Sequence, residues 1–147
     1  MTLIQTIQTE LMRALKAGDS RTKDTLRFIV SQIKYKEIEL KRPATDDEIV
    51  SAIRKQIKEL EEASVQFIAA GRTDLSDENA AQIAILRPLL PQELGDEELL
   101  KEIHAFVEAQ RDIQAANPRA FTGKVVGALK SKADPSRISA LYGRMIK

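Results

Sequence analysis

The sequence predicts an all-α protein, with four helices before a lobe boundary and three helices after it. Apolar residues recur every three or four positions almost throughout, and the apolar–polar alternation typical of strands is missing. Capping residues, glycines and prolines divide this pattern into segments of helical length. At 147 residues the chain can bury a core without disulfides, and it contains no cysteine.

The first two helices are delimited by a glycine and a proline. Gly18 suits the left-handed residue that follows a helix, and Asp19 or Ser20 can cap the next helix. Arg42-Pro43 ends that second helix, because the residue before a proline avoids helical backbone angles. The expected inward positions are Ile4, Ile7, Leu11, Leu15, Leu26, Ile29, Val30, Ile33 and Leu40.

The third helix begins with a capping box at Thr45-Asp46-Asp47-Glu48 and ends at Gly71. Because only a short break separates the long second and third helices, we expect them to pack as an antiparallel hairpin. A shorter fourth helix starts at Ser76 and is closed by Pro91. The expected inward positions are Ile49, Ile53, Ile57, Leu60, Phe67, Ile83, Leu86 and Leu90.

The segment Pro91–Gly95 is the expected lobe boundary, which places the lobes at residues 1–92 and 93–147. Three acids at residues 96–98 favour a helix N-terminus, where the helix dipole stabilises them. Asn117-Pro118 and Asp134-Pro135 are typical starts for the two remaining helices. The expected inward positions are Leu99, Ile103, Phe106, Val107, Phe121, Val125, Leu129, Ile138, Leu141 and Met145.

Charge is distributed unevenly along a chain whose net charge is only +1. Residues 1–73 sum to +2, residues 74–116 to −7, and residues 117–147 to +6. The acidic and basic segments of the second lobe could pair with each other. Alternatively, the basic segment forms an exposed face for phosphates.

Two glycines lie four residues apart in this basic segment, at Gly123 and Gly127. They share one side of a helix and would let another backbone approach closely. Tight packing inside the lobe is one interpretation, and approach to an RNA backbone is the other. Thr122-Gly123-Lys124 is not a phosphate-binding loop, because Pro118 and Val125 replace the required Gly and Ser/Thr.

A second unusual stretch is Gly71-Arg72-Thr73-Asp74-Leu75, at a sharp junction between two helices. The structural interpretation is that Gly71 adopts a left-handed conformation, Asp74 caps the next helix and Arg72 binds carbonyls or carboxylates. The functional interpretation is that Arg72 and Asp74 face a ligand.

No group of residues suggests catalysis. His104 is the only histidine, and Glu102 lies at the wrong spacing to share a metal with it on one helix face. We therefore expect no catalytic residue, metal or cofactor. No apolar stretch is long enough to cross a membrane and no signal peptide is visible, so a cytoplasmic protein without a membrane partner is expected.

Several motifs together resemble the YqeY family over nearly the whole chain. They are Leu26-Arg27, Ile33-Lys34, Glu37-Ile38-Glu39, Phe67 followed by Gly71-Arg72 and Asp74-Leu75, Ile83 through Leu90-Pro91 to Leu94, and Gly123-Lys124-Val125. The family is the free-standing relative of the C-terminal tail of GatB, a subunit of the glutamine-dependent Asp-tRNA/Glu-tRNA amidotransferase. Two features depart from the family pattern: Thr122 replaces a usual Met, and residues 132–136 lack the usual glycines.

The resemblance implies an all-α fold of two lobes, an N-terminal four-helix bundle and a C-terminal three-helix bundle. It also implies a translation-related module that contacts tRNA without catalysis of its own. The nucleic-acid-binding residues are expected to be Arg119, Gly123, Lys124, Lys130, Lys132 and Arg137, and the structural motif Gly71, Arg72, Asp74, Leu75 and Pro91. One alternative is a module that docks an amidotransferase or an aminoacyl-tRNA synthetase. A second is a component of a carbon–nitrogen ligase with glutamine as amide donor. The oligomeric state stays open.

Overall fold

The all-α class is confirmed by a computed structural model, which describes residues 2–146. These residues form eight α-helices and one short 3₁₀ helix, with no strand among them. The chain divides into two compact units, residues 1–90 and 91–147. Each unit encloses its own cluster of buried apolar side chains.

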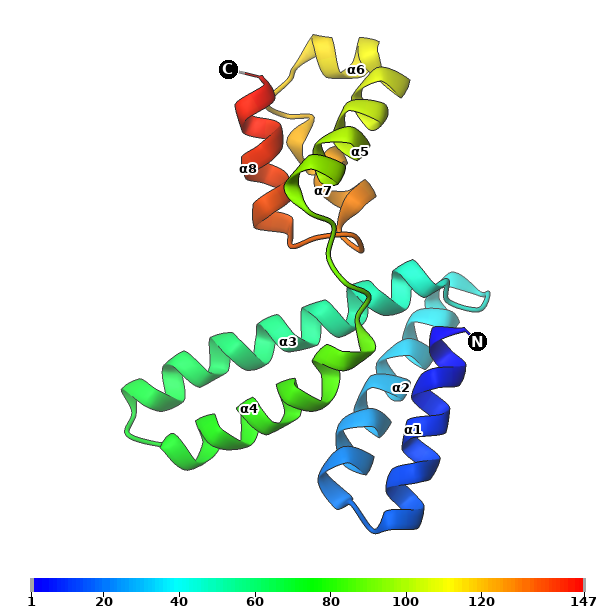
Figure 1. The fold of residues 1–147 in the computed structure, drawn as a ribbon, viewed down its shortest axis with the longest axis vertical. Coiled ribbons are helices and arrows are strands. Elements are labelled where there is room, and N and C mark those ends of the chain that lie inside the picture. The colour runs from blue at the N-terminus through cyan, green and yellow to red at the C-terminus, as the bar shows by residue number, and fades with distance from the viewer. Residues whose placement is uncertain (1, 147) are drawn as a thin grey trace. The chain divides into compact units, whose positions relative to one another are not determined.

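The first unit consists of two antiparallel helical hairpins, α1–α2 and α3–α4, that diverge from a shared corner (Figure 1). The expected hairpin of the second and third helices is therefore wrong, because α2 packs mainly along α1 and α3 mainly along α4. The helices are α1 (Leu3–Ala17), α2 (Ser20–Leu40), α3 (Asp46–Ala69) and α4 (Thr73–Leu86), followed by the 3₁₀ helix η1 (Arg87–Leu89).

The core of the first unit is aliphatic and lies where the two hairpins meet. Burial of each such side chain contributes about 1.5–3 kcal/mol relative to exposure. Leu15, expected inside, is instead 41% exposed near the end of α1. The buried cluster comprises Ile7, Leu26, Ile29, Ile33, Ile49, Ile53, Ile57 and Leu86.

Both hairpin tips depend on a left-handed glycine. Gly18 has φ 71°, and the next N–H, of Asp19, donates to Ala14 O at 2.9 Å. Gly71 has φ 75°, and the Arg72 N–H donates to Phe67 O at 2.8 Å. These bonds satisfy carbonyls that a helix end would otherwise leave unpaired, so each glycine reverses the chain.

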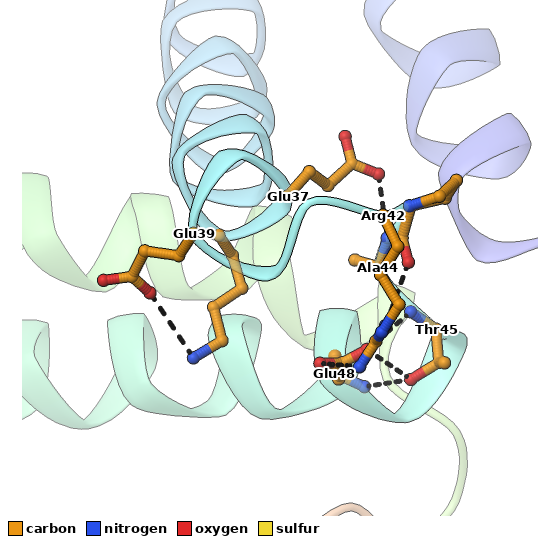
Figure 2. Close-up of polar contacts among 8 residues, drawn as sticks. Glu37, Glu39, Arg42, Ala44, Thr45 and Glu48 are labelled. Carbon is orange, nitrogen blue, oxygen red and sulfur yellow. Dashed lines mark hydrogen bonds and ion pairs between the residues drawn. The ribbon is translucent and has the colours of Figure 1, made fainter.

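The corner between α2 and α3 is held by a carboxylate (Figure 2). Thr45 and Glu48 form the expected capping box, with Thr45 N to Glu48 Oε1 at 2.9 Å and Glu48 N to Thr45 Oγ1 at 3.2 Å. Arg42 binds the same carboxylate through two nitrogens at 2.7 and 3.2 Å. Glu37, from the last turns of α2, accepts the Ala44 N–H at 2.8 Å. The connection between the hairpins is thereby fixed at both ends.

The second unit contains four helices, so the expected count of three is wrong by one. The fifth helix breaks at Gln110, whose backbone leaves helical angles, and a short sixth helix follows. The helices are α5 (Asp96–Ala109), α6 (Arg111–Ala116), α7 (Thr122–Leu129) and α8 (Pro135–Met145). Figure 1 shows α5, α7 and α8 gathered around one centre.

Three helix boundaries differ from expectation. The second helix ends at Leu40, before Arg42, because Lys41 adopts φ 56°. The fourth begins at Thr73 rather than Ser76, since the chain re-enters a helix directly after the Gly71 turn. The helix expected from Asn117 begins only at Thr122, because residues 118–121 form turns instead.

Glu48 provides a pH-dependent test of the corner. The Arg42 guanidinium, and then the Thr45 N–H, lower the pKa of Glu48 to about 2 from 4.5. Since the folded state favours the carboxylate, this stabilisation is complete above pH 4.5 and is lost as the pH falls toward 2. We expect Glu48→Gln to lower the thermal midpoint at pH 7 and the difference from wild type to vanish near pH 2.

The control is Glu39→Gln, because Glu39 makes only an exposed ion pair with Lys36 at 3.8 Å. Thermal unfolding followed by circular dichroism from pH 2 to 7 measures both variants. An equal midpoint shift for the two variants at pH 7 would contradict the role of Glu48.

Candidate nucleic-acid interface

The helix α7 is oriented by one apolar stripe. Phe121, Val125 and Leu129 are buried at intervals of four residues, and α7 packs against α8 and α5. At 3.6 residues per turn this spacing keeps one side of the helix in the core. The opposite side of α7 is therefore presented to solvent.

Tyr142 fixes the segment that leads into α7. Its ring is fully buried, with centroids 6.1 Å from Phe121, and Phe121 stacks on Phe106 at 5.6 Å. The hydroxyl donates to Pro118 O at 2.7 Å and accepts from Gln114 Nε2 at 3.3 Å. The turn holding Arg119 is thereby tied to α8.

The outer side of α7 is largely bare backbone. Gly123 and Gly127 lie opposite the buried stripe, and a Cβ built on either would meet no described atom within 4 Å beyond its chain neighbours and the backbone of its own helix. The interpretation that these glycines allow tight packing within the lobe is therefore wrong. Glycine in a helix is about 1 kcal/mol less favourable than alanine, and no contact among the described residues compensates for that difference.

Three of the expected cations surround this bare surface. Lys124 and Lys130 flank the two glycines on the α7 wheel, and Arg119 lies in the turn before α7. All three side chains are exposed and form no ion pair with any residue that the structure describes. We define these five residues, Arg119, Gly123, Lys124, Gly127 and Lys130, as the α7 surface.

The other two expected cations pair with the acidic segment. Lys132 donates to Glu102 at 3.1 Å. Arg137 binds Glu93 at 3.1 Å, Asp96 at 2.8 Å and Leu94 O at 2.7 Å. The bond to Asp96 is the main reason that the pKa of Arg137 is raised. Internal pairing thus accounts for these two cations only, and Arg137 anchors the start of α5.

The Gly71-Arg72-Asp74 stretch forms a local turn. Arg72 grips the Asp74 carboxylate through Nε at 3.1 Å and a terminal nitrogen at 3.0 Å, which lowers the pKa of Asp74. Asp74 lies inside the first turn of α4 and does not cap it. Leu75 is half-buried and Pro91 is exposed. Both partners of the ion pair are exposed.

Residues 2–146 contain no metal-binding cluster and no helix suited to crossing a membrane. His104 is exposed on α5, and no three His, Asp or Glu side chains gather in a metal-binding arrangement there. None of the helices in this range combines the length and apolar character needed to cross a membrane.

Two residues of the second unit were not predicted as site residues from the sequence. Tyr142 lies beside the expected Leu141, but nothing local distinguishes it from a surface tyrosine; its spacing of four from Ile138 was the only signal. Arg144 is exposed in the last turn of α8 and forms no ion pair within the described chain. Lys147, the last cation of the basic segment, lies outside the described residues.

Comparison with known proteins identifies the family. The model of the Yqey-like protein family matches residues 4–144. The chain belongs to the YqeY-like family. An uncharacterized Schizosaccharomyces pombe protein is 31% identical over 86 residues, which cover 58% of this chain and 70% of the relative. Altered inheritance of mitochondria protein 41, mitochondrial, from Kluyveromyces lactis is 26% identical over 144 residues, covering 93% of this chain and 74% of the relative.

The bonds of Tyr142 give a stability prediction for this YqeY-like protein. Tyr142→Phe keeps the ring packing but removes the hydrogen bonds to Pro118 and Gln114. We expect a loss of about 1–2 kcal/mol in the free energy of unfolding of the second unit, measured in urea. Tyr35→Phe is the control, since Tyr35 is 68% exposed. A change within about 0.5 kcal/mol for both variants would contradict the anchoring role.

The α7 glycines give a second prediction, with the opposite sign. Gly123→Ala with Gly127→Ala should raise the free energy of unfolding by about 0.5–1 kcal/mol per site, because alanine favours the helix and meets nothing. Gly18→Ala should instead destabilise the first hairpin, since φ at Gly18 is 71°. Destabilisation by the α7 pair would show that the glycines do serve internal packing.

Proposed function

We propose that this chain is an RNA-contacting accessory module, working on tRNA in the cytoplasm without catalysis of its own. The α7 surface carries the proposal: unpaired cations flank exposed helix backbone that packs against nothing within the described chain. Phosphate recognition requires cations that are not neutralised internally, and close approach requires small side chains.

The arrangement suits a sugar–phosphate backbone better than base edges. The α7 surface offers no aromatic ring on which a base could stack, and lysine and arginine provide the phosphate contacts. Contacts of this kind fix orientation without reading sequence, so selectivity would come from RNA shape. This supports a folded RNA as the ligand.

The resemblance to the GatB tail supports tRNA as that folded RNA. A module of this type would assist an amidotransferase or an aminoacyl-tRNA synthetase by holding tRNA. Glutamine-dependent ligase activity would then belong to the larger enzyme.

Salt dependence of tRNA binding tests the proposal. For about three phosphate contacts, log K should fall with log salt with a slope of about −2 to −3. Lys124→Glu with Lys130→Glu should weaken binding at least tenfold at low salt and flatten the slope. Fluorescence anisotropy with labelled tRNA measures both quantities.

The matched control is Lys16→Glu with Lys55→Glu, which changes the net charge equally on exposed positions of the first unit. Equal losses for the two double variants would indicate a general charge effect and contradict the assignment to α7.

The variant Gly123→Ala with Gly127→Ala distinguishes an effect on RNA contact from an effect on the stability of the fold. Added methyl groups should hold an RNA backbone away and weaken binding several-fold, although the same changes are expected to stabilise the fold. Unchanged affinity for tRNA in this more stable variant would remove the glycines from the proposed interface.

A further inference from the structure

The outer face of α2 lies outside the proposed RNA site and carries three large exposed apolar side chains. Phe28, Tyr35 and Ile38 are 47%, 68% and 73% exposed, and none belongs to the core of the first unit. The opposite face of α2 supplies core residues, including Leu26, Ile29 and Ile33. The helix is thus apolar on two sides, and residues 2–146 cover only one of them.

The exposed apolar residues follow the spacing of a helix-pairing seam. Phe28, Ser31, Tyr35 and Ile38 are separated alternately by three and four residues, as are the inward positions of coiled-coil helices. Because the side chains at such positions stay on one side of the helix, they form a continuous strip. We call these four residues the α2 seam.

A row of cations runs along one edge of the α2 seam. Arg27 and Lys34 of α2 lie seven residues apart, about 10.5 Å along the helix axis, and Lys41 follows the end of α2 seven residues later in the sequence. All three are exposed, and within residues 2–146 none forms an ion pair. Arg27 and Lys34 occupy the seam-flanking position at which paired helices place complementary charges. The other flank carries Gln32 and Glu39, so the positive charge is one-sided.

Surface recesses lie at the two ends of the seam. Phe28 lines one recess together with Gln56 of α3 and Gln82 of α4. Ile38 and Lys34 line a shallow hollow at the α2–α3 corner, closed by Arg42 and Pro43. Figure 2 shows Glu37 and Glu39 of α2 beside this corner. Large side chains of a bound helix would find room at both places.

We propose that the α2 seam docks an amphipathic helix of a partner protein, with the partner's acidic residues facing Arg27 and Lys34. The apolar strip supplies burial, and the cation row selects an acid repeated every seven residues. A second copy of this seam fits poorly in antiparallel pairing, because the same cation rows would face each other. A helix with acids along one edge matches both the apolar and the charged features.

The test uses two synthetic peptides of three heptads, identical in their apolar seam, with either Glu or Lys at both flanking positions. Each peptide repels itself, so both stay monomeric. Binding of the labelled peptides to the full chain is measured by anisotropy, and backbone NMR shifts locate the contact. The Glu peptide should bind at least tenfold more tightly than the Lys peptide, with shifts in α2.

Three double variants test whether the α2 seam is the site that binds the Glu peptide. Tyr35→Ser with Ile38→Ser should reduce affinity for the Glu peptide at least tenfold, and Arg27→Glu with Lys34→Glu should reverse the preference between peptides. The control, Val65→Ser with Ile68→Ser, removes equally exposed apolar side chains from α3 and should change affinity less than twofold.

Several results would overturn the proposal. They are absence of saturable binding to the Glu peptide, equal affinity for both peptides, and equal loss in the seam and control variants. A dimer seen in sedimentation that the seam variant dissolves would assign the face to a second copy. Loss of tRNA binding in the seam variant, with peptide binding unchanged, would assign it to RNA.

Discussion

The packing of Phe121, Val125 and Leu129 into the core of the second unit decides what that unit presents to solvent. The three residues recur every fourth position, so they fix the rotation of α7 about its own axis. Tyr142 then fixes its start, because its hydroxyl bonds to Pro118 and its ring contacts Phe121. With rotation and start both set by buried contacts, Gly123, Lys124 and Gly127 must face outward.

The basic C-terminal segment thereby acquires two distinct roles. Arg137 has a structural role, because it joins α8 to residues 93–96 at the start of α5 by binding two carboxylates and a carbonyl. Its positive charge complements the acids at the α5 N-terminus, which the helix dipole also favours. Arg119, Lys124, Lys130 and Arg144 have no such partner in the described chain, so their charge stays available to a ligand. The net charge of the segment overstates what a polyanion could use.

Features that depend on a few neighbouring residues were predictable from sequence. The Thr45–Glu48 capping box, the Gly18 turn with Asp19 and the Asp134-Pro135 helix start are local hydrogen-bonding or backbone preferences, and the structure confirms them. The turns that precede α7 are instead tied to a tyrosine 24 residues beyond Pro118, and no local pattern contains that contact. The pairing of α2 with α1 rather than with α3 was not predicted either, because it depends on packing between helices and not on a local sequence pattern.

Whether Gly123 and Gly127 face a packed neighbour or solvent could not be predicted from the sequence. Spacing placed Gly123 and Gly127 on one helix face, but both a packed and an open face satisfy that spacing. Only the positions of the surrounding side chains distinguish a packed face from an open one, and the structure shows that the face is open.

The periodicity of the α2 seam likewise leaves open whether its apolar side chains are packed or exposed. Periodicity puts Phe28, Tyr35 and Ile38 on one strip, and their exposure shows that no described residue covers that strip. The two surfaces differ in chemistry, since bare backbone with cations suits phosphates, whereas an apolar strip with a one-sided charge row suits a helix. They also belong to different units, each with its own core, so occupation of one requires no rearrangement of the core beneath the other.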